Sequence, residues 1–194
     1  MFALAPAPAQ PRRRQLLVGT AFAAAAAAMV LAGQLAMWMQ VRDNAGGSTL
    51  KWLPKKAVVN EVAANSMLVT LFGASLLVQW AVYATKRGDR RHAAYALALT
   101  ATFALAVIVA QIRIYDDMAV KVKEAPYGAL FYGVTGTFLL LVVIGIGFCV
   151  VAAVRALGGR VSGADREVVS ATALWFHSLS VVFCFVWFVV YAVK

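Results

Sequence analysis

The fold is decided by the stretch 125–154, which runs APYGALFYGVTGTFLLLVVIGIGFCVVAAV and contains no charged side chain. A helix rises about 1.5 Å per residue, so roughly 20 apolar residues cross the hydrocarbon core of a bilayer. This stretch is therefore long enough to span a membrane as one helix. Four further uncharged stretches meet the same criterion, and they lie at residues 15–41, 62–85, 92–112 and 168–193.

The composition extends this prediction to the whole chain. Of its 194 residues, 63% are hydrophobic and 13% are charged, whereas a soluble domain is about half apolar and a quarter charged. We expect an all-α, polytopic integral membrane protein with five transmembrane helices, built as one domain over residues 15–194. A short Pro/Ala/Arg-rich tail at residues 1–14 precedes it.

The net charge of +10 is informative through its distribution and does not indicate a nucleic-acid partner. The segments on the side of the N-terminus carry ten Lys and Arg residues and three acidic residues, and those on the other side carry eight and five. Basic clusters at 12–14 and 86–91 lie next to spans, where the positive-inside rule acts most strongly. The prediction is a cytoplasmic N-terminus and an outside C-terminus.

The first span has an alternative interpretation as a secretory signal peptide, because basic residues precede an alanine-rich run. The apolar region of a signal peptide has only about 7–15 residues. The uncharged stretch here continues to Val41, which favours a retained membrane helix.

The deep parts of the predicted spans contain no Asp, Glu, Lys or Arg, and the exceptions near the ends are His177 and the boundary residue Arg113. A proton pump, an ion-coupled transporter or a haem or quinone site normally needs several such groups near the midplane. We interpret His177, beside Ser178 and Ser180, as a hydrogen-bonded packing residue. No catalytic, cofactor-binding or metal-binding residue is predicted in this chain.

Other conspicuous residues have ordinary structural interpretations. Asp116, Asp117 and Glu124 alternate with lysines and are expected in a solvated loop. Cys149 and Cys184 lie in apolar stretches and are expected to act as small hydrophobes. Small residues are expected to line helix seams, and they are the alanines of the first span with Gly133, Gly136, Gly145 and Gly147. Aromatic residues near span ends are expected at the membrane interface, and they are Trp38, Trp52, Trp80, Tyr83, Tyr115, Trp175 and Tyr191. The bulky run 181–190 is expected to face lipid or a partner subunit.

The order of polar landmarks resembles subunit III of the haem-copper terminal oxidases, in a divergent five-helix bacterial form. The first span contains AGQLAMW at 32–38, similar to the family's segment of Ala-Gly, two variable residues, Ala and an aromatic residue. The second contains Asn65 near its start and ends at a turn with Gly88 and Arg90, and the third ends in Gln111 and Tyr115, similar to Gln-x-x-Glu-Tyr.

The most specific part of the resemblance opens the fourth span. Residues 127–136 are YGALFYGVTG, similar to the family's Tyr-Gly-Ser-x-Phe-Tyr-x-x-Thr-Gly, and the fifth span holds Phe176 and His177 where the family has Trp-His. The positions that carry the resemblance are expected to be structural, and they are Asn65, Gln111, Tyr115, Tyr127, Gly128, Phe131, Tyr132, Thr135, Gly136 and His177.

The departures from the family pattern share one property, because titratable positions have become apolar or neutral. They fall at Ala27, Ile114, Phe138, Leu141 and Ser180. A role that depends on a carboxylate or histidine at those positions is therefore not expected here.

The resemblance implies a non-catalytic accessory subunit of a respiratory haem-copper oxidase in the bacterial cytoplasmic (inner) membrane. It would stabilise subunit I, in a complex that also contains subunit II. Haem and copper would lie in those partners, and this chain would hold phospholipid in a cleft between helices, with helices of another subunit completing the wall. Three alternatives remain open at this point: the related subunit of nitric oxide reductases, a small membrane transporter, and an assembly factor.

Overall fold

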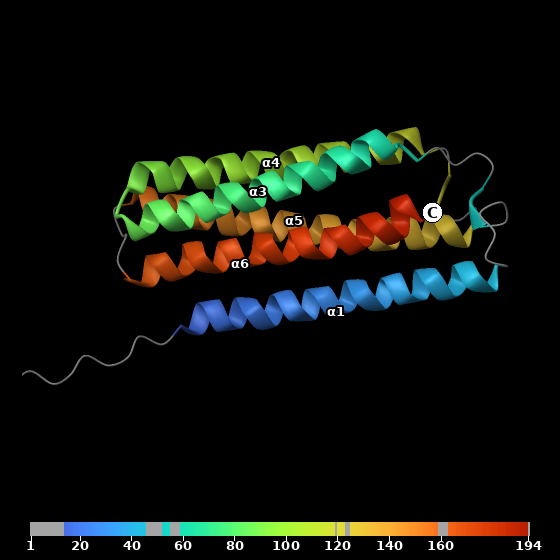
Figure 1. Cartoon of the computed structure of the whole chain (residues 1–194), viewed down its shortest axis with the longest axis horizontal. Helices are drawn as coiled ribbons and strands as arrows, with labels where there is room; N and C mark the ends of the chain where they lie inside the picture. The colour runs from blue at the N-terminus through green and yellow to red at the C-terminus, as the bar shows by residue number, and fades with distance from the viewer. Residues whose placement is uncertain are drawn as a thin grey trace, which may run out of the picture.

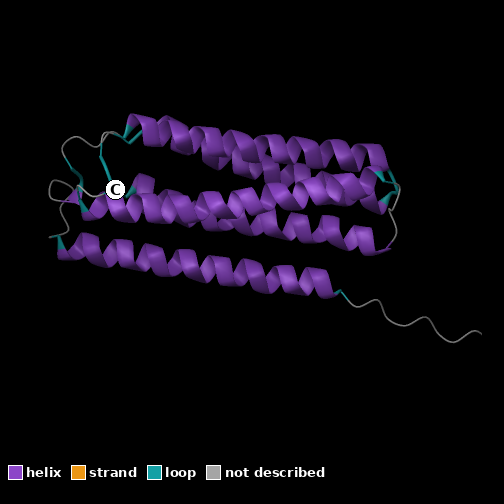
Figure 2. Cartoon of the chain, turned by 180° about the vertical axis from the view of Figure 1, so that it is seen from behind, coloured by secondary structure: helices purple, strands orange, loops and turns teal. Residues whose placement is uncertain are grey.

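The computed structural model describes residues 14–45, 52–54, 59–118, 120–122, 125–158 and 163–193, with side chains from 166 in the last range. The predicted N-terminal tail therefore lies outside the described residues except for Arg14. The described chain is entirely helical apart from its turns and loops (Figure 2). Its elements are α1 (Gln15–Asn44), α3 (Glu61–Lys86), α4 (Arg90–Asp117), α5 (Pro126–Leu157), α6 (Gly163–Val186) and the π-helix η1 (Trp187–Ala192).

Five helices in the described part of the chain are long and apolar enough to cross a membrane, which confirms the predicted fold class. Each extends past the predicted span at one or both ends; α4, for example, runs from Arg90 to Asp117, where residues 92–112 were expected. The physical reason is that a helix ends at a capping signal and not at its first charged residue. Asn60 and Asp89 cap α3 and α4 with their side chains, and Pro126 occupies the first turn of α5.

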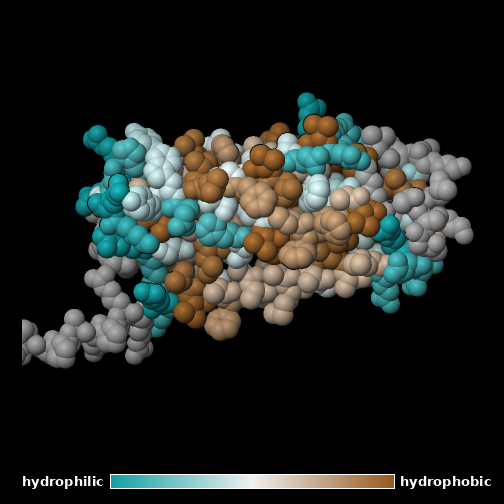
Figure 3. Space-filling model, in the orientation of Figure 1, coloured by the Kyte–Doolittle hydropathy of each residue, from teal (hydrophilic) through white to brown (hydrophobic). Residues whose placement is uncertain are grey.

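The helices run nearly side by side, with α3 and α4 at one edge of the bundle and α1 at the other (Figure 1). Helix α6 lies between α1 and α3, and α5 lies behind it. A short turn joins α3 to α4, and Gly88 adopts a φ of 78° there, a left-handed conformation that favours glycine. Hydrophilic residues gather at the two ends and apolar side chains cover much of the middle of the visible face (Figure 3).

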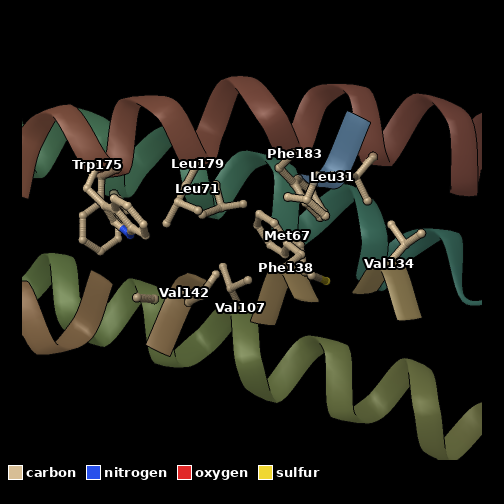
Figure 4. Packing of buried hydrophobic residues seen from close by; sticks show 14 of the residues in the cluster. Leu31, Met67, Leu71, Val107, Val134, Phe138, Val142, Trp175, Leu179 and Phe183 are labelled. Atoms are coloured by element: carbon tan, nitrogen blue, oxygen red, sulfur yellow. The ribbon is translucent and has the colours of Figure 1, made fainter. Parts of the chain in front are cut away.

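The core combines one side of every helix. Leu31, Met67 and Val107 bring α1, α3 and α4 into it, and the rings of Phe138 and Phe183 join α5 to α6 with centroids 4.7 Å apart (Figure 4). The prediction that the run 181–190 faces lipid or a partner all round was wrong, because Phe183, Val186 and Val190 are buried. The remaining face of the run, including Phe185, is exposed.

Several aromatic residues expected to form a belt at the membrane interface do not face outward. Trp38, Trp52, Trp175 and Tyr191 are buried inside the bundle, and Tyr115 is half-buried. Trp80 and Tyr83 do remain exposed. A sequence places an aromatic residue near the end of a span, but its direction is set by the neighbouring helices.

Only one of the four glycines expected at helix seams in α5 lies at a close contact. A Cβ atom on Gly145 would stand 3.1 Å from Trp175 Cδ1 and 3.2 Å from Phe176 Cζ, so this glycine lets α6 approach. A Cβ atom on Gly133, Gly136 or Gly147 would meet nothing within 4 Å. The seam prediction is wrong for these three positions.

The cap of α4 generates a pH prediction. Asp89 Oδ1 accepts the backbone N–H of His92 at 3.1 Å, and this bond holds the pKa of the Asp89 carboxyl below its usual value of 3.8. The depressed pKa means that the cap is complete above the ordinary value and is lost as the pH falls through the lower folded value.

We expect Asp89→Ala to lower the Tm of the purified protein at neutral pH, and the difference from the unmodified chain to shrink as the pH falls through the lowered pKa of the carboxyl and the cap protonates. Asp89→Asn retains a capping oxygen that does not titrate, and it is the matched control. A Tm difference for Asp89→Ala that stays constant from neutral to acid pH would contradict the role of the charged cap.

Candidate functional site

Six of the residues singled out in the sequence meet at the end of the bundle where α4 ends and α5 begins. They come from three elements: Gln111 and Tyr115 from α4, Tyr127, Phe131 and Thr135 from α5, and Tyr191 from η1. The ring of Phe131 lies at their centre, with centroids 5.9 Å from Tyr127, 6.2 Å from Tyr115 and 5.9 Å from Tyr191. We call these six residues the outer cluster.

Two hydrogen-bond chains hold the outer cluster together. Tyr191 donates its hydroxyl to Gln111 Oε1 at 2.9 Å. Thr135 donates to the backbone carbonyl of Phe131 at 2.6 Å, so its oxygen is left to accept the hydroxyl of Tyr115 at 2.7 Å. These bonds connect α4 to both η1 and α5 in a region with little water to compete for them.

The π-helical turn accounts for part of this arrangement. Helix α6 changes to the wider π-helix η1 at Trp187, and two side chains of η1 reach different neighbours. Trp187 donates its ring N–H to Asn65 Oδ1 on α3 at 2.8 Å, while Tyr191 reaches α4. Nothing in the sequence signalled a π-helix, and the change of pitch is visible only in the structure.

An aromatic triangle adjoins the outer cluster. Trp38 at the end of α1, Trp52 in the following segment and Tyr127 lie edge to face, with ring centroids 5.2 to 5.6 Å apart. All three are buried, and the ring N–H groups of both tryptophans and the hydroxyl of Tyr127 have no hydrogen-bond partner within the described protein. Gln111 Nε2 is also buried without one. These donors make the region less stable than its packing alone would suggest.

His177 lies apart from this region, toward the other end of the bundle, and contacts α3. Its Nε2 lies 3.2 Å from Gln79 Oε1, an acceptor, so Nε2 carries the proton and Nδ1 accepts the hydroxyl of Ser75. Both ring nitrogens are thereby occupied by protein groups. In the described part of the chain, no three His, Cys, Asp or Glu side chains lie together as they would to hold a metal ion.

The remaining predicted positions differ in how closely they pack. A Cβ atom on Gly128 would stand 2.8 Å from the backbone oxygen of Lys121, so this glycine allows the preceding segment to cross α5. The rings of Tyr132 and Tyr115 are tilted by 41° to each other with centroids 4.9 Å apart, and the Tyr132 hydroxyl donates to the carbonyl of Val120 at 3.3 Å. Gly136 follows Thr135 on α5 and has open space beside it.

Sequence reasoning missed the polar contacts that α6 makes with the other helices. Glu167 Oε1 accepts the backbone N–H of Leu17 at 3.0 Å and so caps the start of α1. Ser180 donates to the carbonyl of Leu71 on α3 at 3.1 Å, and Trp175 donates to that of Leu141 on α5 at 3.1 Å. Their partners lie between 34 and 150 residues away, so no local pattern could have revealed them.

The geometry first defines a class. The chain is a multi-pass helical membrane protein in which, within the described residues, hydrogen bonds from side chains join one helix to another. Comparison with known proteins then gives the family. The chain belongs to the cytochrome c oxidase subunit III family, whose family model matches residues 56–193. This confirms the resemblance over α3 to η1, whereas α1 precedes the matched residues.

Individual relatives agree with the family assignment. Cytochrome c oxidase subunit 3 of Bos taurus is 28% identical over 133 residues, which are 66% of this chain and 51% of the relative. The protein of the same name from Paracentrotus lividus gives the same figures, and the one from Rattus norvegicus is 27% identical over the same coverage. The chain spans about half the length of the curated relatives it matches.

Loss of the hydroxyl should change the stability of the protein differently at two tyrosines of this region. Tyr191→Phe removes the partner of Gln111 Oε1, and we expect it to lower the stability by about 1–2 kcal/mol. Tyr127→Phe removes a buried hydroxyl that has no partner among the described residues while keeping the ring, and it should leave the stability within about 0.5 kcal/mol or raise it. The measurement is thermal unfolding in detergent followed by tryptophan fluorescence. Equal losses for both variants would show that the hydrogen bonds assigned here are incorrect.

Two glycines of α5 form a second matched pair. Gly128→Ala places a methyl group against the backbone of Lys121, which cannot swing aside as a side chain can, so we expect a loss of about 1–3 kcal/mol. Gly133→Ala adds the same methyl group to open space and should be neutral or slightly stabilising. Thermal unfolding of both variants tests the comparison, and a stable Gly128→Ala variant would contradict it.

Proposed function

We propose that the chain is a non-catalytic subunit of a respiratory haem-copper oxidase complex, bound to the catalytic subunit I in the membrane. The family match is the observation that carries this proposal. Its support in the structure is that Tyr115, Tyr191 and His177 bond to other groups of the same chain. Haem and copper, and with them oxygen reduction, then belong to partner subunits.

The charge distribution supports a cytoplasmic N-terminus in a bacterial inner membrane. The segments on the side where α1 begins carry ten Lys and Arg residues against three acidic residues, and those on the opposite side carry eight against five. The positive-inside rule places the first of these sides in the cytoplasm.

A phospholipid in a cleft between helices is part of the same proposal. Helices α1 and α6 enclose an open groove of about 410 Å³ whose lining is mainly apolar, with Ala21, Ala25 and Ala28 on one side and Leu174 and Val181 on the other. Because alanine side chains are short, the groove has room for an acyl chain. Stabilisation of subunit I would follow from the contact of this lipid-lined face with its helices.

The proposal predicts what accompanies the protein out of its native membrane. After extraction in mild detergent, the tagged chain should co-purify with a large multi-helix subunit, and the reduced-minus-oxidised optical spectrum should contain haem bands. An unrelated tagged membrane protein from the same membranes is the control.

Two outcomes would overturn the oxidase assignment. A chain that emerges alone and colourless from intact membranes would not be an oxidase subunit, and transport would be assayed next. A partner with haem but with non-haem iron in place of copper would instead identify a nitric oxide reductase complex, the alternative raised by the apolar residues at Ile114 and Phe138.

A further inference from the structure

An open groove of about 560 Å³ lies between α3 and α4 near the end of the bundle that holds the outer cluster, on a different side from the α1–α6 groove. Its polar wall is formed by Asn60, Ser66, Arg113 and Asp117, and its apolar wall by Val62, Ala63 and Ala110. The volume lies within the range of about 300–1,000 Å³ that small-molecule sites occupy. Neither the outer cluster nor the proposed oxidase role uses these residues.

Arg113 is the cation that lines this groove. It is exposed on α4, and the structure gives it no ion pair within the described ranges. It lies 23 residues after Arg90, or about 35 Å along the helix, which places its guanidinium near the far boundary of a bilayer whose hydrocarbon core is about 30 Å thick. At that depth the abundant anionic groups are phospholipid phosphates, and an arginine fork can bind two phosphate oxygens together.

Asp117 supplies the opposite charge one helical turn further out. Its Oδ2 accepts the side-chain amide of Asn60 at 2.9 Å, a bond that holds the carboxylate over the groove from the α3 side. A cation and a carboxylate thus face the same groove at successive turns of one helix. This pair disfavours a purely anionic headgroup and complements one that carries both a phosphate and an ammonium group.

The surface below the groove suits acyl chains. Val109 and Leu105 lie one and two turns below Arg113 on the same face of α4, and both are exposed. Val69 and Leu76 continue the exposed apolar stripe on α3. A phospholipid carries a charged headgroup at one end of two apolar chains and so matches this surface, whereas a soluble peptide does not.

We propose that the α3–α4 groove binds a zwitterionic phospholipid with a primary ammonium, a phosphatidylethanolamine, with its phosphate on Arg113 and its ammonium on Asp117. A primary ammonium donates hydrogen bonds to a carboxylate, which the quaternary ammonium of phosphatidylcholine cannot do. Phosphatidylglycerol has the phosphate but no cation for Asp117. The site is therefore selective for headgroup as well as for charge.

The test is native mass spectrometry of the delipidated full-length chain, titrated separately with phosphatidylethanolamine, phosphatidylglycerol and phosphatidylcholine of the same acyl chains. Phosphatidylethanolamine should bind at least about fivefold more tightly than either of the others. Arg113→Gln should weaken it about tenfold, and Arg113→Lys, which keeps the charge but loses the fork, should weaken it less.

The role of the Asp117 carboxylate is tested separately by lipid titration. Asp117→Asn should weaken phosphatidylethanolamine several-fold while leaving phosphatidylglycerol unchanged or tighter, so that the preference between the two lipids narrows or reverses. Asp116→Asn, which removes the adjacent exposed carboxylate outside the groove lining, is the matched control and should leave both affinities unchanged. Circular dichroism and Tm establish that each variant is folded.

Three results would overturn the proposal: equal binding of the three lipids, lipid binding that does not respond to Arg113→Gln, or loss of a co-purified subunit in Arg113→Gln without any change in lipid binding. The last result would assign the groove to a protein partner. Because the titration uses the purified chain, its outcome does not depend on whether the chain is an oxidase subunit.

Discussion

The bundle depends on the polar side chains of α6 and η1, which hydrogen-bond to each of the other four spanning helices. Glu167 reaches α1, Ser180 and His177 reach α3, Trp175 reaches α5, and Tyr191 reaches α4. Burial of apolar surface does little to hold helices together in lipid, because the surrounding chains are as apolar as leucine. Close packing and such bonds therefore fix which helices are neighbours, and α6 together with its continuation η1 bonds to all the others.

The same requirement accounts for the residues found where the resemblance expects a titratable group. Ile114 and Phe138 are buried in the core, where Phe138 packs against Phe183, and Ser180 bonds to the backbone of α3. At each of these positions the side chain packs or donates a local bond, where a charged group would be costly in a membrane.

The outer cluster combines strong and weak features in a small volume. Tyr115, Tyr191 and Thr135 form hydrogen bonds, yet four buried donors in or beside the cluster have no partner among the described protein groups. A cluster of this kind depends on aromatic packing around Phe131 and Tyr127 for its order. It also sits where α1, α4, α5 and η1 converge, so a change in its packing would reach most of the bundle.

The sequence by itself determined the number of spans, their approximate positions and the family. Hydropathy adds up along the chain, so a run without charge such as 125–154 predicts a membrane helix without reference to any neighbour. The motif positions Gln111, Tyr115, Tyr127, Phe131 and Thr135 were likewise found from their order alone. That they form one cluster was decided by the tertiary structure, as were the burial of Trp38 and Trp175, the π-helix at Trp187 and the cap that Glu167 gives to α1. The direction of a side chain and its hydrogen-bond partner depend on which helices lie beside it, and residues as far apart as Leu17 and Glu167 meet only after the whole bundle has assembled.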